Sequence, residues 1–103
     1  MMIEYDKIVR DRIPEIIEKS GAKYDIEILT DEQALIYLEK KLQEEADEYY
    51  KNRSIEELAD IMEVIEAIAE RKGYAFGRLL SLKEEKRKAR GGFEKNILLK
   101  RTY

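Results

Sequence analysis

The sequence predicts a mainly α-helical protein whose core is an antiparallel hairpin of two long helices. Apolar residues recur at three- and four-residue spacing across residues 35–49 and again across residues 55–69, as on amphipathic helices. The polar turn Lys51-Asn52-Arg53 separates the two runs, and no stretch has the composition of a linker. We therefore expect residues 1–103 to form one domain in which further helices accompany the hairpin.

Shorter elements are expected on either side of the hairpin. Residues 11–20 predict a first helix, since Pro14 fits its opening turn and Gly21 favours its end. Residues 24–29 alternate apolar and acidic side chains, which is typical of a half-buried strand. The apolar run at residues 96–100 predicts a second strand, and the two would pair as a small two-stranded β element.

Local signals mark the ends of the later helices. Thr30 followed by Gln33 has the spacing of a capping box and predicts the start of the first long helix. Ser54 predicts the start of the second long helix. A last helix is expected at residues 75–90, ended by Gly91-Gly92.

Apolar residues cover a broad arc of the second long helix, which should run to about residue 72. The predicted inner stripe consists of Ile55, Leu58, Met62, Ile65 and Ala69. Ile61, Val64 and Ile68 widen this arc, so we expect the helix to be buried on two sides. A chain of this size buries little surface alone, so self-association into a helical bundle is expected.

Composition excludes several kinds of site and partner. The chain has no cysteine and no histidine, which excludes disulfides, thiolate chemistry and the usual neutral-pH acid–base group. Its formal charge of −3 argues against a nucleic-acid duplex as partner. No window approaches the roughly 18 apolar residues of a membrane span, and the N-terminus lacks the apolar core of a signal peptide. A cytoplasmic protein with no membrane contact is the expectation.

Four acidic residues stand symmetrically about the hairpin turn. Glu45 and Glu48 share one face of the first long helix, and Glu57 and Asp60 share one face of the second. Folding the chain between Asn52 and Arg53 places Glu48 opposite Glu57. The same fold places Glu45 opposite Asp60, so the four carboxylates are predicted to converge.

The four carboxylates differ in how strongly their positions require a cation. Glu45 falls on the buried stripe of the first long helix, formed by Leu35, Leu38, Leu42 and Tyr49. Burial there is costly without a cation or hydrogen bonds. Glu48 lies at the edge of the stripe, near a helix C-terminus that disfavours negative charge. Glu57 and Asp60 also fit a solvated acidic face, and Glu57 completes capping-box spacing with Ser54. Oxygen-only donors favour Mg²⁺ or Mn²⁺ over zinc.

The acidic motifs resemble those of the MazG-like and phosphoribosyl-ATP pyrophosphohydrolase-like proteins, an all-α nucleoside triphosphate (NTP) pyrophosphatase group. That family's signature, Glu-Glu-x-x-Glu followed by Glu-x-x-Asp, reads here Glu44-Glu45-Ala46-Asp47-Glu48 and Glu57-Leu58-Ala59-Asp60. Residues 5–15 and 90–94 extend the match to a small single-domain branch. The family usually has a longer gap than the eight residues between Glu48 and Glu57, so the chain is read as a compact variant.

The resemblance implies the chemistry and the site residues. Glu45, Glu48, Glu57 and Asp60 would be the metal ligands, and Glu44 a supporting or second-metal carboxylate. The candidate catalytic residues are Glu44 and Glu45. The resemblance also implies a homodimer or higher homo-oligomer in which both subunits supply site residues. Hydrolysis between the α- and β-phosphates of an NTP would yield a nucleoside monophosphate and pyrophosphate, with Mg²⁺ (or Mn²⁺) as cofactor. The expected role is housekeeping. Alternatives are phosphoribosyl-ATP pyrophosphohydrolysis, a non-catalytic nucleotide-binding or regulatory module, and a helical interaction protein with a solvated acidic face.

Basic residues are candidates for phosphate contacts. Lys86 and Arg90 follow helical spacing on the last helix, and the resemblance favours them as substrate-binding residues. For Lys7, Arg10 and Arg12, a structural or subunit-contact role is as good an interpretation as a substrate role. Tyr37, Tyr49 and Tyr50 are candidates for stacking on a base, but Tyr49 continues the apolar stripe and is better assigned to the core.

Overall fold

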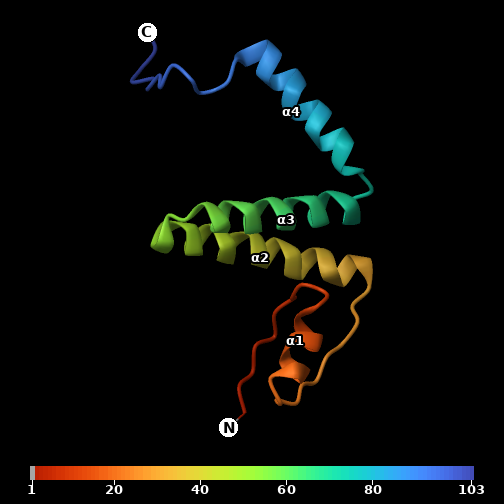
Figure 1. Cartoon of the computed structure of the whole chain (residues 1–103). Helices are drawn as coiled ribbons and strands as arrows, with labels where there is room; N and C mark the ends of the chain where they lie inside the picture. Colours follow the sequence, from red (N-terminus) through yellow and green to blue (C-terminus); the bar gives the residue numbers. More distant parts are fainter. Residues whose placement is uncertain (1) are drawn as a thin grey trace.

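The structure, a computed structural model, describes residues 2–103, and the regular secondary structure in that range is exclusively helical (Figure 1). Its helices are α1 (Ile13–Lys19), α2 (Asp31–Asn52), α3 (Ile55–Arg71) and α4 (Phe76–Arg90). The two long helices, α2 and α3, lie antiparallel along each other in the middle of an elongated molecule that measures 60 × 32 × 24 Å. The predicted helical class and the hairpin are confirmed.

Side-chain caps begin both hairpin helices. Thr30 Oγ1 accepts the N–H of Gln33 at 3.2 Å, and Gln33 Oε1 accepts the N–H of Thr30 at 3.1 Å, which confirms the capping box. Ser54 Oγ accepts the N–H of Glu57 at 3.4 Å. The second half of that box is missing, because the Glu57 carboxylate instead accepts a hydrogen bond from the Asn52 amide at 3.4 Å. Glu57 is thereby held at the hairpin turn.

The helix ends also follow the predicted signals. Arg53 ends α2 in the left-handed conformation, φ +57°, and its N–H donates to the Tyr49 carbonyl at 2.7 Å. Gly91 ends α4 at φ +84°, a conformation that a residue with a Cβ rarely adopts, and its N–H donates to the Arg87 carbonyl at 2.7 Å. The hairpin turn is thus short enough to bring the acidic segments of α2 and α3 together.

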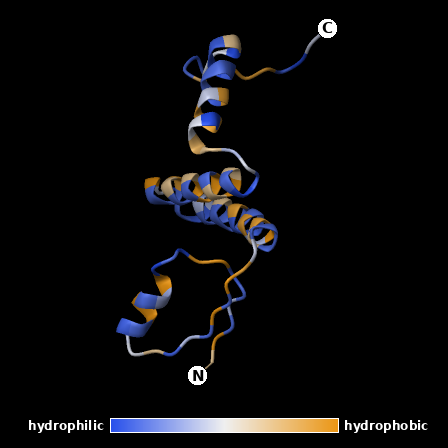
Figure 2. Cartoon of the chain, turned by 90° about the vertical axis from the view of Figure 1, so that its right-hand side faces the viewer, coloured by the Kyte–Doolittle hydropathy of each residue, from blue (hydrophilic) through white to orange (hydrophobic). Residues whose placement is uncertain are grey.

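The predicted two-stranded β element is wrong. Residues 24–29 and 96–100 are irregular, and no strand forms within residues 2–103. The first segment runs between α1 and α2, whereas the second follows α4 at the other end of the molecule (Figures 1 and 2). An isolated two-stranded element is marginally stable at best, and here the intervening helices keep the two segments apart.

The side of α3 that faces α2 differs from the predicted inner stripe. Ile55 and Met62 are 71% and 59% exposed, and Leu58 is exposed too. Val64 is buried and Ile61 half-buried, so the margin of the predicted arc is turned toward α2. The inner-stripe prediction is wrong for these residues, and the first half of α3 is covered by α2 along one side only. Figure 2 shows hydrophobic positions along both hairpin helices and in the extended segments flanking α1.

The buried core is correspondingly small. Within the described residues, the buried hydrophobic side chains are Ala34, Leu38, Val64 and Ala69. Among the helices of residues 2–103, α4 packs on α3 alone, and α1 contributes no buried residue. None of the helices in residues 2–103 combines the length and apolar character that crossing a membrane requires.

Candidate metal centre

Three carboxylates meet between the hairpin helices near the turn. Glu45 comes from α2, and Glu57 and Asp60 come from the first two turns of α3. One oxygen from each carboxylate lies within 4.8 Å of the other two. The inward rotation of α3 explains this meeting, because Glu57 and Asp60 share the helix side of Ile61 and Val64. The convergence predicted for these three residues is present.

Glu45 is the most enclosed of the three. Its side chain is only 13% exposed, as its position on the apolar stripe of α2 predicts. Burial raises the pKa of the Glu45 carboxyl, and the neighbouring Asp60 and Glu57 carboxyls raise it further. Lys41, whose ammonium lies 3.7 Å from Glu45 Oε1, opposes that rise in pKa. The site therefore disfavours the charged form of Glu45 unless more positive charge is supplied.

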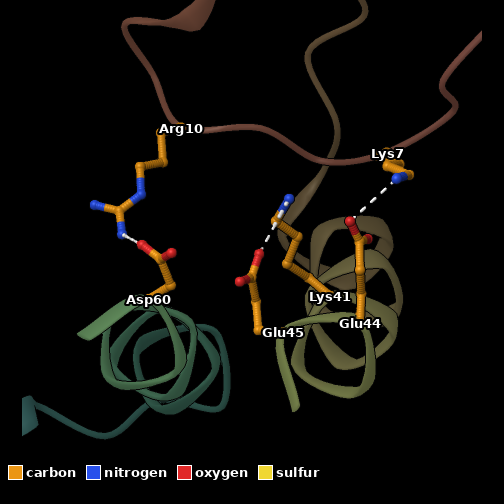
Figure 3. Close-up of polar contacts among 6 residues, drawn as sticks. All are labelled: Lys7, Arg10, Lys41, Glu44, Glu45 and Asp60. Atoms are coloured by element: carbon orange, nitrogen blue, oxygen red, sulfur yellow. Dashed lines mark hydrogen bonds and ion pairs between the residues drawn. The ribbon is translucent and has the colours of Figure 1, made fainter. Parts of the chain in front are cut away.

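Glu48 lies outside this group. Its side chain is directed to Lys51, 3.9 Å away, and Glu57 is met by Glu45 instead. Glu48 is at the edge of the buried arc, so its side chain stays at the margin of the hairpin. Glu44 is also outside the three, but it is adjacent to Glu45 and accepts a hydrogen bond from the Lys7 ammonium at 3.0 Å (Figure 3).

The segment before α1 crosses the hairpin above these carboxylates. Arg10 donates from Nη2 to Asp60 Oδ1 at 2.7 Å, and Lys7 reaches Glu44 (Figure 3). Ile8, which lies between Lys7 and Arg10 in the sequence, is half-buried and lines a hollow together with residues of α2. The sequence left the roles of Lys7 and Arg10 open, and no local spacing could have paired them with acids so distant along the chain. Arg12 makes a local ion pair instead, with Glu15 at 3.2 Å.

Lys86 and Arg90 are remote from the carboxylates within one chain. They lie in the second half of α4, which leaves from the C-terminal end of α3 (Figure 1). Glu57 and Asp60 lie at the opposite end of α3. The cations that the structure places at the site are Arg10, Lys7 and Lys41. Lys41 was not among the predicted site residues, although its i,i+4 spacing to Glu45 is the local signal that identifies it.

The three converging carboxylates could hold a metal ion. Three carboxylate oxygens so close together repel one another, and here Arg10 and Lys41 supply part of the compensating charge. The same ion pairs are compatible with a purely structural network. Comparison of the chain with protein-family models, curated proteins and solved structures found no match. A function is therefore inferred from the chain's own residues and from its motifs.

Proposed function

We propose that this protein is a Mg²⁺-dependent NTP pyrophosphohydrolase that yields a nucleoside monophosphate and pyrophosphate. The observation that carries the proposal is the meeting of Glu45, Glu57 and Asp60 within 4.8 Å at the hairpin turn. The resemblance of residues 44–48 and 57–60 to the acidic motifs of MazG-like pyrophosphohydrolases supports the same activity.

The donor set suits Mg²⁺ or Mn²⁺. Both ions prefer oxygen ligands, and Mg²⁺ in nucleotide sites commonly takes a few carboxylates together with substrate phosphates and water. Glu45, Glu57 and Asp60 would hold the ion, and Glu48 would join them as a fourth ligand by turning away from Lys51. When bound, the ion would neutralise phosphate charge and lower the pKa of a water molecule.

The remaining carboxylate has a separate role in this proposal. Glu44 stands beside Glu45 but outside the three converging oxygens, and its side chain is 34% exposed. The Lys7 ammonium holds this carboxylate beside the site, where Glu44 would orient the attacking water and accept its proton, a task for which the chain has no histidine. The proton goes to the Glu44 carboxylate as the anhydride between the α- and β-phosphates breaks and pyrophosphate leaves.

Self-association belongs to the same proposal. The apolar face of α3 formed by Ile55, Leu58 and Met62 is exposed in one chain, and the buried core is small. A second copy packed on that face would bury it and would complete a helical bundle. In a cytoplasmic homodimer or higher homo-oligomer, Lys86 and Arg90 would contact phosphates at a site of another subunit.

Pyrophosphate release tests the activity directly. The full-length protein is incubated with Mg²⁺ and a panel of NTPs and with phosphoribosyl-ATP, beside Glu45→Gln. Glu39→Gln is the matched control, because Glu39 lies on the same helix, is exposed and is outside the carboxylate group. We expect release by the wild type and the control, and loss of about 100-fold or more in Glu45→Gln.

The other outcomes assign the alternative functions. Turnover confined to phosphoribosyl-ATP would show that the substrate is phosphoribosyl-ATP and not an NTP. Nucleotide binding without pyrophosphate release would point to a binding or regulatory module. Absence of both Mg²⁺ binding and nucleotide binding would leave a helical interaction protein with an acidic face.

A further inference from the structure

A hollow of about 220 Å³ lies beside the carboxylates, between residues 5–8 and one face of α2. Lys7 and Tyr5 line it from the N-terminal segment, and Lys40, Lys41 and Tyr37 line it from α2. Glu44, which directly precedes Glu45 in the sequence, also lines the hollow. The roles proposed for the carboxylates in hydrolysis leave the lysines of this hollow without a function.

The hollow gathers positive charge at close range. Three lysines line it against two acids, Asp6 and Glu44. Lys40 makes no ion pair within the described residues, and its ammonium lies 5.1 Å from the centre of the Tyr37 ring. Lys41 and Lys7 are paired with Glu45 and Glu44, which belong to or adjoin the carboxylate group. An anion in the hollow would thus meet the Lys40 ammonium, which has no acidic partner within residues 2–103, and the ammonium groups of Lys7 and Lys41, which face the carboxylates.

We propose that this hollow is the subsite for the terminal diphosphate of the substrate, and so the place where the pyrophosphate product resides. The inference deepens the proposed function and rests on it. Lysine ammonium groups and tyrosine hydroxyls both donate hydrogen bonds to phosphate oxygens. The volume is below the roughly 300–1,000 Å³ of pockets that enclose a whole drug-sized ligand, so the hollow suits one part of a nucleotide.

The position of the hollow fixes the direction of the substrate. Glu44 borders the hollow and is followed in sequence by Glu45, while Lys41 lines the hollow and contacts Glu45. A phosphate chain that leaves the carboxylate group past Glu44 and Lys41 would therefore enter the hollow. The α-phosphate then lies at the carboxylates, the β- and γ-phosphates lie among the lysines, and the nucleoside extends to the opposite side.

Binding of inorganic pyrophosphate tests the subsite without requiring turnover. Calorimetric titration with Mg²⁺ present compares the wild type with Lys40→Gln and with Lys7→Gln/Lys40→Gln. Lys40→Gln breaks no ion pair, so it separates loss of binding from loss of folding. The charge-matched control is Lys23→Gln/Lys95→Gln, at two exposed positions outside the hollow. A third arm, Lys86→Gln/Arg90→Gln, tests the cations of α4.

We expect Lys40→Gln to weaken pyrophosphate binding about tenfold, the double variant to weaken it further, and the control to change it less than about twofold. No pyrophosphate binding by the wild type, or unchanged affinity in the double variant, would overturn the subsite. Loss in the α4 arm alone would overturn it too and would assign the diphosphate to Lys86 and Arg90.

Two results separate this inference from the proposed function. Lysine-dependent pyrophosphate binding by a wild type that hydrolyses no NTP would keep the subsite and refute the activity. Hydrolysis with kcat and KM unchanged in Lys7→Gln/Lys40→Gln would keep the activity and refute the subsite.

Discussion

Arg10 Nη2 lies 2.7 Å from Asp60 Oδ1, although the two residues stand 50 positions apart in the chain. The contact brings a guanidinium onto one of the three carboxylates proposed to hold a metal ion. Arg10 and a divalent cation would therefore compete for the negative charge of Asp60. The same contact tethers the N-terminal segment to α3.

The first prediction follows from that competition. Arg10→Gln should bind Mg²⁺ about two- to fivefold more tightly than the wild type, the factor that roughly 0.5–1 kcal/mol of relieved repulsion gives for a partly exposed pair. Calorimetric titration with Mg²⁺ measures it. Arg12→Gln is the control, because Arg12 pairs with Glu15 and not with the carboxylate group. Unchanged or weaker Mg²⁺ binding in Arg10→Gln would contradict the competition.

The second prediction concerns the pH dependence of stability. Burial raises the pKa of Glu45 in the folded protein above its ordinary value of 4.5, so the folded state holds this proton more tightly than the unfolded chain. The folded state therefore loses stability as the pH rises from the pKa of Glu45 in the unfolded chain to its higher pKa in the folded protein. Above the folded-state pKa the loss is complete.

Glu45→Gln removes that loss. In the presence of a chelator, the variant should be more stable than the wild type at about pH 7, and the difference should shrink below about pH 4.5. Urea unfolding at both pH values measures it, with Glu39→Gln as the control. Equal stability at neutral pH would show that Lys41 already compensates the Glu45 charge.

The helical framework could be predicted because its signals are local. Thr30 with Gln33, the short polar turn before Ser54 and Gly91 at the end of α4 each act through neighbouring backbone groups. The burial of Glu45 could also be predicted from the sequence, because the apolar stripe on α2 is narrow enough to define one inward face.

The rest depended on contacts between distant segments. Apolar residues cover so much of α3 that periodicity alone could not select the side facing α2, and the exposed stripe of Ile55 and Met62 was mistaken for the inner one. Lys7 and Arg10 reached their acidic partners only through the path of the N-terminal segment. The alternation in residues 24–29 indicated a strand, but a strand needs a neighbour that this chain does not bring to it.

The third prediction ranks the candidate metal ligands. Saturating Mg²⁺ should stabilise the wild type, by about 2.7 kcal/mol at one hundred times the dissociation constant. Asp60→Asn and Glu57→Gln should abolish most of the accompanying rise in Tm, because their oxygens belong to the converging three. Glu48→Gln should keep a larger part of it, since Glu48 is directed to Lys51. A greater loss in Glu48→Gln than in Glu57→Gln would reverse this ranking.

The fourth prediction concerns the exposed face of α3. Ile55→Asp/Met62→Asp places two charges on a stripe that a second copy is proposed to cover, where they would be buried without partners. An aspartate at position 55 lies in the first turn of α3, where the helix dipole favours negative charge, so the helix itself should persist. The wild type should therefore sediment as a homodimer or larger, and the variant as a helical monomer.

Analytical ultracentrifugation with circular dichroism separates assembly from folding in this test. Ser81→Asp/Thr102→Asp adds the same charge at exposed positions outside α3 and should keep the wild-type assembly. A monomeric wild type would refute self-association, and an unaltered oligomer in Ile55→Asp/Met62→Asp would move the interface to another surface. If Lys86 and Arg90 act on phosphates from a second subunit, the monomeric variant should also lose NTP affinity while pyrophosphate still binds through Lys40 and Lys41.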